Sequence, residues 1–269
     1  MSTPVTPGGS RPHGLVARLR VTGPDLFAAA LALLAAAGAT WWLLGLPATY
    51  LLHVAVLYVG FAALVVTGFA GGGGAVGIGV ANRITLLRST WVLALGGLVL
   101  HDPVFPSAVW WIIALSIAAM VLDGVDGHVA RRSGAASRFG ARLDMEVDAF
   151  LLLVLSVLVW QGGKVGEWVL AVGGIRYFFV AAGWILPPLR AELPVSQRRK
   201  AVCVVQGAVL LACLLPAVPA SAAALLAGTG LALLVYSFAV DVAWLAASGR
   251  TPGGSRREAG GEVGDNGAS

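Results

Sequence analysis

Residues 123–148 read DGVDGHVARRSGAASRFGARLDMEVD, a polar stretch that joins two apolar segments. Four of the eight aspartates in the chain fall within it. Asp123 and Asp126 lie three residues apart at the end of the first apolar segment. Asp144 and Asp148 lie four residues apart at the start of the second. In a helix, either spacing places both side chains on one face. Since the polar turn brings the two helices back antiparallel, the pattern predicts four carboxylates that converge at one boundary of a membrane.

The rest of the chain has the composition of a membrane protein. Of its 269 residues, 58% are hydrophobic and 12% are charged, and the mean hydropathy is +0.86. Soluble domains carry about 25% charged residues, so this chain has too little polar surface for a water-soluble globule. The composition also excludes a disordered chain, a nucleic-acid-binding domain and a disulfide scaffold. Cys203 and Cys213 lack CxxC spacing and are interpreted as small buried side chains.

Apolar segments rich in Leu, Ala and Val alternate with short polar loops. They show no period-2 alternation, so they are predicted to be membrane helices and not barrel strands. The predicted fold is an all-α, polytopic membrane helical bundle. Its eight segments are 26–46, 50–70, 84–101, 107–125, 143–161, 166–187, 201–217 and 221–247.

Composition shifts divide the chain into five parts. Residues 71–79 (GGGGAVGIG) lack the Lys-Ser or Lys-Thr of a P-loop, so we interpret them as part of a flexible linker. The ends are rich in Pro, Gly, Ser and Arg and are predicted to be disordered cytoplasmic tails. The predicted parts are an N-tail at 1–23, an accessory transmembrane hairpin at 24–70, the linker at 71–81, a catalytic six-helix domain at 82–247 and a C-tail at 248–269.

The distribution of basic residues predicts the orientation in the membrane. If the N-terminus is cytoplasmic and the segments alternate, all of the 18 basic residues except Lys164 and Arg176 fall on the cytoplasmic side. This segregation is typical of cell-membrane proteins that cross the bilayer several times, and it also accounts for the net charge of +5. Both termini and the acidic stretch are therefore predicted to be cytoplasmic. Tryptophans gather at the predicted outer ends, at Trp41, Trp42, Trp110, Trp111, Trp160 and Trp168.

Four carboxylates near hydrocarbon repel one another unless they are protonated or bind a cation. All the ligands offered are hard oxygens, with no His or Cys at helical spacing, so Mg²⁺ or Mn²⁺ is the expected ion. Four carboxylates can hold two such ions, and a two-metal site suits phosphoryl or phosphatidyl transfer. Gly127 and Ala130 would let a flat group or a second helix approach the backbone, and Arg131 would bind a phosphate. The alternative is a structural ion-pair cluster of the aspartates with Arg131, Arg138 and Arg142.

The stretch 123–148 resembles the signature of the class I CDP-alcohol phosphatidyltransferase family, D-x2-D-G-x2-A-R-x8-G-x3-D-x3-D, at every fixed position. The stretch Asn82-Arg-Ile-Thr85-Leu-Leu-Arg88 is similar to the N-x-x-T-x-x-R that opens the first core helix of the family. The run Arg198-Arg199-Lys200 is similar to its acceptor-phosphate site. The resemblance covers roughly residues 82–247, and the hairpin lies outside the usual six-helix core.

The resemblance implies an enzyme of phospholipid biosynthesis. An alcohol would attack the β-phosphate of a CDP-alcohol, usually CDP-diacylglycerol, and CMP would leave. Asp123, Asp126 and Asp144 would ligate one metal ion, and Asp123, Asp144 and Asp148 the second. Asp148 would also accept the proton of the attacking hydroxyl. The implied CDP-alcohol-binding residues are Asn82, Thr85, Gly127, Ala130, Arg131 and Ser137. Arg198 and Lys200 would bind an acceptor phosphate, and a homodimer is expected from the family alone.

The aspartates and the basic run are also compatible with other functions. An intramembrane prenyltransferase would use the aspartates and Mg²⁺ to hold a diphosphate, and a divalent-cation transporter would use them as its ion site. The basic run at 198–200 is also ordinary for a cytoplasmic loop. Its charge favours a polyol phosphate such as glycerol 3-phosphate or inositol phosphate as acceptor, without excluding serine or another lipid.

Four further polar residues are interpreted as follows. Arg176 lies within a predicted span, and it either pairs with Asp241 or points toward substrate phosphate. His128, at a variable position of the motif, is interpreted as a neighbour of the headgroup or phosphate. His53 and His101 are isolated in the sequence and are predicted to be structural or solvated.

Overall fold

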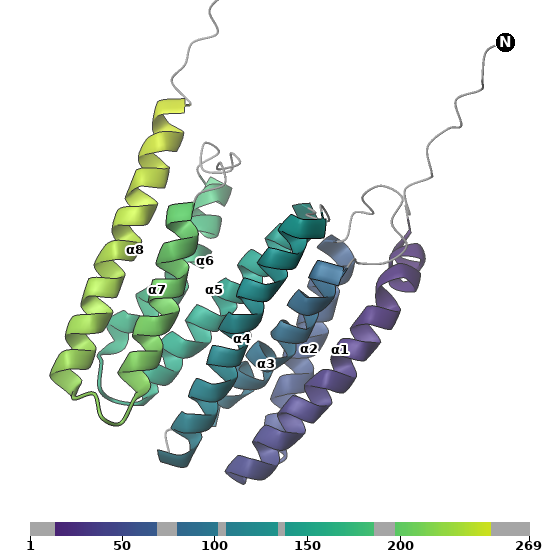
Figure 1. Cartoon of the computed structure of the whole chain (residues 1–269), viewed down its shortest axis with the longest axis horizontal. Helices are drawn as coiled ribbons and strands as arrows, with labels where there is room; N and C mark the ends of the chain where they lie inside the picture. Colours follow the sequence, from purple (N-terminus) through teal and green to yellow (C-terminus); the bar gives the residue numbers. More distant parts are fainter. Residues whose placement is uncertain (1–13, 69–79, 102–105, 134–137, 186–196, 249–269) are drawn as a thin grey trace, which may run out of the picture.

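The computed structural model describes residues 14–68, 80–101, 106–133, 138–185 and 197–248, and these form α-helices, one short 3-10 helix and no strand. The helices run alternately up and down side by side, and the all-α bundle predicted from the sequence is confirmed (Figure 1). They are α1 (Leu15–Leu44), α2 (Thr49–Gly68), α3 (Val80–Leu98), α4 (Pro106–Ser133), α5 (Arg138–Gln161), η1 (Glu167–Val169), α6 (Leu170–Ile185), α7 (Gln197–Leu214) and α8 (Ala220–Ser248).

Among the described residues, five stretches of helix are long and apolar enough to cross a membrane: Val16–Leu44, Thr49–Gly68, Ser107–Gly124, Glu167–Ile185 and Ala220–Trp244. Eight spans were predicted from the sequence. The three other helices, α3, α5 and α7, carry charged residues such as Arg88, Asp148 and Lys200, which lower their hydropathy. Within a membrane bundle such residues are tolerated where they face its interior or a polar cavity.

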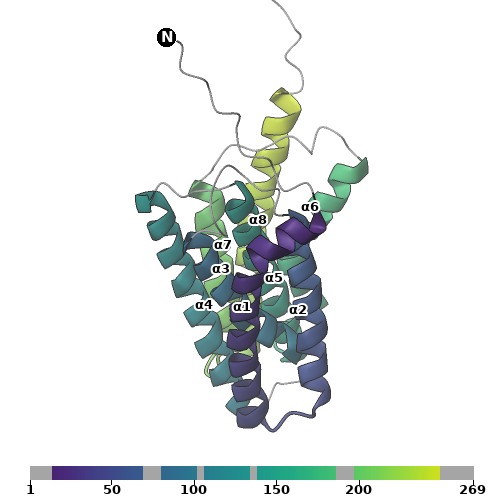
Figure 2. The same ribbon diagram turned by 90° about the vertical axis from the view of Figure 1, so that its right-hand side faces the viewer.

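Two predicted boundaries are wrong. Helix α1 begins at Leu15, although the N-tail was predicted to extend to residue 23. The early turns are held in place because Arg18 Nη1 donates a hydrogen bond to the carbonyl oxygen of Thr67 on α2, at 3.0 Å. Pro24 lies inside the helix, and in Figure 2 the first turns lean away from the rest of α1, as expected where proline removes a backbone hydrogen bond. Helix α3 begins at Val80, within the predicted linker.

Other predicted segments fall largely or wholly outside the described residues. These are the linker up to residue 79, residues 1–13 of the N-tail and residues 249–269 of the C-tail.

The accessory hairpin of α1 and α2 packs closely against α3. Tyr50 of α2 donates its hydroxyl proton to the carbonyl oxygen of Ala94, at 2.9 Å. A Cβ atom at Gly97 of α3 would lie only 2.5 Å from Val54 Cγ2 and 2.9 Å from Tyr50 Cε2, so the helices meet where α3 has no side chain. The hairpin is therefore part of the bundle core and holds α3 in position.

Two histidines predicted to be isolated contact each other between the hairpin and the end of α3. His53 Nδ1 lies 2.9 Å from His101 Nε2, and the ring of His101 also packs edge-on against Tyr50. This contact joins α2 to the turn after α3, a pairing that nothing in the sequence spacing indicates.

Candidate active site

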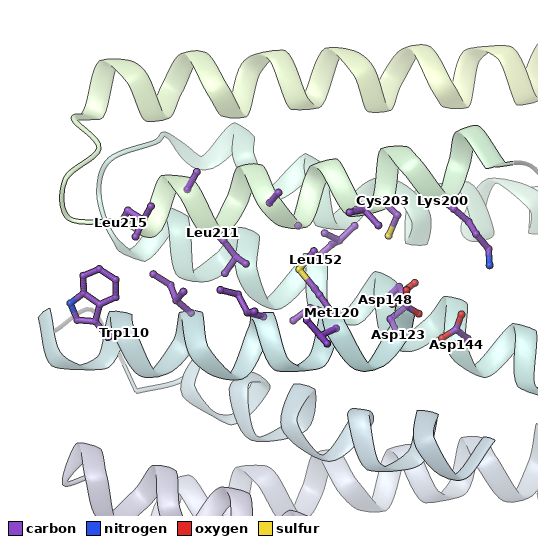
Figure 3. Close-up of a pocket in the computed structure, with 18 residues that line it drawn as sticks. Trp110, Met120, Asp123, Asp144, Asp148, Leu152, Lys200, Cys203, Leu211 and Leu215 are labelled. Carbon is purple, nitrogen blue, oxygen red and sulfur yellow. The ribbon is translucent and has the colours of Figure 1, made fainter. Parts of the chain in front are cut away.

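Three of the four predicted carboxylates come together inside the bundle. Asp123 projects from α4, and Asp144 and Asp148 project from successive turns of one face of α5 (Figure 3). Each offers one oxygen atom in a group whose members all lie within 4.8 Å of one another. The side chains are 27% to 31% exposed, so the oxygens are accessible from a cavity and not sealed in the core. The convergence predicted from the two helical spacings is confirmed for these three residues.

The fourth carboxylate, Asp126, belongs to α4, but its side chain lies outside the described residues. The surroundings of Gly127, His128, Ala130 and Arg131 of α4 are likewise not described, and Ser137 lies wholly outside the described residues. Their predicted roles in binding metal and the CDP group, or in contacting the headgroup in the case of His128, therefore remain predictions.

Arg88 of α3 lies directly behind the carboxylates. Its Nη1 donates hydrogen bonds to Asp123 Oδ1 at 2.6 Å and to Asp148 Oδ1 at 2.9 Å. Its Nη2 donates to Asp144 Oδ1 at 2.5 Å. The structural ion-pair alternative considered Arg131, Arg138 and Arg142, whereas the described ion pairs of these aspartates are made by Arg88.

Arg88 is the last residue of the N-x-x-T-x-x-R stretch, and no role was predicted for it from the sequence. Asn82, Thr85 and Arg88 follow one another at intervals of three, so they lie on one side of α3. All three are buried, with exposed fractions of 7%, 4% and 1%. In the sequence, polar residues at this regular interval within an apolar segment are the signal that could have identified Arg88. Asn82 and Thr85 are not among the described residues that line the cavity.

The donor set fits a divalent cation. Three carboxylates and one guanidinium carry a combined charge of −2, which a divalent ion neutralises. The ligands are all hard oxygens, the type that Mg²⁺ and Mn²⁺ prefer. In the hydrogen bonds described above, Arg88 contacts only the Oδ1 atom of each carboxylate. The other oxygen of a carboxylate is also an acceptor.

A cavity of about 700 Å³ extends from the aspartates along the bundle, and it is open on one side, since lining residues such as Val121 and Val204 are exposed. It lies between α4, α5 and α7, with Trp110 and Leu215 at the end away from the aspartates (Figure 3). The wall between these ends is apolar apart from Cys203. Because Trp110 and Asp123 are separated by thirteen residues of α4, this wall is about 20 Å long.

The two residues predicted to bind an acceptor phosphate point in different directions. Lys200 lines the cavity at its acidic end (Figure 3). Arg198 donates a hydrogen bond to Asp241 Oδ1 of α8 at 2.5 Å and is not among the described lining residues. Arg199 also lies 3.6 Å from Asp241 Oδ2.

Arg176 follows neither predicted alternative. It forms an ion pair with Glu146 of α5, and Asp241 is paired with the basic residues of α7 instead. Glu146 stands two residues from both Asp144 and Asp148, and residues two apart on a helix face different ways. The Arg176–Glu146 pair therefore joins α5 to α6 away from the acidic cluster.

Comparisons with known proteins agree with this geometry. The chain is 29% identical over 120 residues to a protein of Cereibacter sphaeroides named CDP-diacylglycerol–glycerol-3-phosphate 3-phosphatidyltransferase. The match covers 40% of this chain and 53% of the relative, so it spans about half the length of that protein. No solved structure matches the chain. A family model described as CDP-alcohol phosphatidyltransferase matches residues 78–240, which include α3 to α7 and most of α8. Because this match covers more than half of the chain, the chain belongs to the CDP-alcohol phosphatidyltransferase family.

Proposed function

We propose that this protein is a divalent-metal-dependent enzyme that transfers a phosphatidyl group from CDP-diacylglycerol to an acceptor alcohol and releases CMP. The observation that carries the proposal is the continuity between the three aspartates and the long apolar cavity. One end suits a diphosphate and its metal ions, and the remainder suits hydrocarbon. The membership in the family supports the same reaction class.

The apolar wall favours a lipid donor over a water-soluble CDP-alcohol. Its length of about 20 Å exceeds half of the ~30 Å hydrocarbon core of a bilayer. An acyl chain that follows the wall from Asp123 would reach Trp110, and the nucleotide would remain beside the carboxylates. A small polar donor would leave most of this cavity without a function.

In the proposed reaction, the acceptor hydroxyl oxygen attacks the β-phosphorus of the donor and forms a new P–O bond. The bond from that phosphorus to the bridging oxygen breaks, and CMP leaves with its electron pair. Asp148 accepts the hydroxyl proton. Asp123, Asp126, Asp144 and Asp148 would hold divalent ions, which would supply positive charge against the negative charge that develops on CMP.

The acceptor is proposed to be a polyol phosphate, with glycerol 3-phosphate as the first candidate. Lys200 places a positive charge on the cavity wall at the same end as the carboxylates, where an anionic acceptor would approach the donor. The relative from Cereibacter sphaeroides is named for glycerol 3-phosphate. Arg198 could bind the acceptor phosphate only if its ion pair with Asp241 broke first.

An acceptor screen tests the proposal. Purified full-length protein receives CDP-diacylglycerol, Mg²⁺ or Mn²⁺, and one of glycerol 3-phosphate, inositol phosphate, glycerol, inositol or serine. Mass spectrometry identifies the lipid product, and chromatography quantifies CMP. We expect CMP and a phosphatidyl-polyol phosphate. If no acceptor gives CMP, the proposed donor chemistry is contradicted. If only a phosphate-free acceptor gives a product, the proposed acceptor is contradicted.

The variant Asp148→Asn should lower turnover at least a hundredfold, since it removes the proton acceptor and a metal-binding charge. Glu146→Gln is the matched control, because it neutralises a carboxylate two residues away that is bonded to Arg176 and not to the cluster. Size-exclusion profiles of both variants establish that the fold is retained. Full activity of a folded Asp148→Asn protein would contradict the mechanism.

A further inference from the structure

Arg88 is the most completely buried charged residue among the described residues, and every ion pair described for it is made with the acidic cluster. Its side chain is 2% exposed. It reaches from α3 to three carboxylates that belong to two other helices, α4 and α5. A guanidinium has donors in a fixed plane, so bonds to three separate acceptors define where each acceptor must lie.

Arg88 and the cavity lie on different sides of the carboxylates. Asp123, Asp144 and Asp148 line the cavity, and Arg88 is not among its described lining residues. The aspartate side chains are more than ten times as exposed as that of Arg88. A ligand that enters the cavity would therefore meet the carboxylates first, with Arg88 behind them.

We propose that Arg88 is the positioning residue of this centre: it gathers the three carboxylates from behind and preorganises them for a divalent ion. This inference rests on the proposed function, because it assumes that the carboxylates bind metal. Residues that orient metal ligands by hydrogen bonding typically change metal affinity by about 10- to 100-fold when they are replaced. Arg88 needs no contact with substrate to act in this way.

A competing role for Arg88 predicts the opposite change in metal affinity. If Arg88 were only a cation that takes the place of the metal ion, its removal would relieve charge repulsion and tighten metal binding. If Arg88 positions the ligands, its removal lets three carboxylates repel one another and move apart, and metal binding weakens. The direction of the change in affinity therefore distinguishes the two roles.

The test measures Mn²⁺ binding to the purified full-length protein in detergent, after treatment with EDTA, from the electron paramagnetic resonance signal of free Mn²⁺. We expect Arg88→Gln to bind Mn²⁺ about 10- to 100-fold more weakly than the wild type. Arg88→Lys keeps the charge but not the planar set of donors, so it should also bind more weakly, by about tenfold. The control is Arg20→Gln, which removes an exposed guanidinium of α1 outside the acidic cluster; it should bind like the wild type.

Loss of Arg88 could prevent folding, because it leaves three part-buried carboxylates without this partner. In that case Arg88→Lys decides the question, since it keeps the charge in the cluster. Its CMP release should require roughly tenfold more Mn²⁺ for half-maximal rate, and saturating Mn²⁺ should restore most of the maximal rate. Binding by Arg88→Lys or by folded Arg88→Gln that equals or exceeds wild-type binding would overturn the inference. Failure of the wild type to bind Mn²⁺ would instead overturn the metal dependence in the proposed function.

Discussion

Gly207 of α7 packs against the end of the Met120 side chain of α4, and both residues line the cavity. A Cβ atom at Gly207 would lie 2.8 Å from Met120 Cε and 3.0 Å from Met120 Sδ. Both residues belong to the apolar wall between the aspartates and Trp110. A larger side chain at position 207 would therefore fill space that we assign to an acyl chain of the donor.

Gly207→Leu should lower kcat/KM for CDP-dioleoylglycerol roughly tenfold, a typical cost of mismatched volume in an apolar substrate pocket. A donor with six-carbon chains should be affected less, because its chains end nearer the aspartates. CMP release at several donor concentrations measures both values. Val205→Leu, on the same helix but not among the described lining residues, is the control. An equal loss for the long and the short donor would contradict the assignment.

At the level of helices, the hairpin α1–α2 supports α3, the helix that carries Arg88. Contacts near both ends of the hairpin hold it there. Asp25 of α1 forms an ion pair with Arg83 at 2.8 Å, and the Tyr50 hydroxyl bonds to Ala94. Since Arg88 lies between these points on α3, the hairpin contributes to where its guanidinium is placed.

Gly97→Val should destabilise the protein by about 1–3 kcal/mol, the usual cost of forcing extra atoms into a packed contact. The added Cβ would meet the ring of Tyr50, which cannot bend away as a flexible chain does. Gly60→Ala is the control, because nothing lies within 4 Å of a Cβ there, and alanine favours a helix over glycine by ~1 kcal/mol. Thermal unfolding in detergent compares the two. A Gly97→Val protein as stable as Gly60→Ala would contradict close packing of the hairpin.

The helices were predictable because long apolar segments ending in polar turns leave few alternatives in a membrane. The meeting of Asp123 with Asp144 and Asp148 was predictable because the intervening turn is short. The start of α1 was not predictable, because its first turns are fixed by a hydrogen bond from Arg18 to Thr67 of α2, which is distant in the sequence. The partner of Arg176 was missed for the same reason.

The separation of Arg198 from Lys200 could have been foreseen from the sequence alone. Residues two apart on a helix point in different directions, so both could not line one cavity once α7 extended through them. The partner of Arg198, Asp241, lies on α8 and could not be identified without the tertiary structure.

Across the whole molecule, the acidic cluster lies toward one end of the bundle. In Figure 1 this is the end at which α1 begins and α8 finishes. The turn after α5, with Lys164, and the following η1, which begins at Glu167, lie at the opposite end. Because basic residues are in excess at the first end, the positive-inside rule predicts that this end is cytoplasmic.

Cysteine labelling tests this orientation. In a background of Cys203→Ala and Cys213→Ala, a cysteine replacing the exposed Glu167 should react with a membrane-impermeant maleimide in intact cells. A cysteine replacing the exposed Arg20 should react only after permeabilisation, because it lies on the cytoplasmic side. The reverse pattern would place the acidic cluster outside the cell and contradict the predicted topology.

The central claim is that the aspartates at the end of the apolar cavity hold divalent ions that the transfer reaction requires. The most direct measurement is CMP release from CDP-diacylglycerol and glycerol 3-phosphate by the purified wild-type protein, first after EDTA treatment and then during titration with Mg²⁺ or Mn²⁺. We predict no release without metal, saturable restoration with it, and at least a hundredfold lower turnover for Asp148→Asn at every metal concentration. Undiminished CMP release in EDTA, or normal release by the folded Asp148→Asn protein, would contradict the claim.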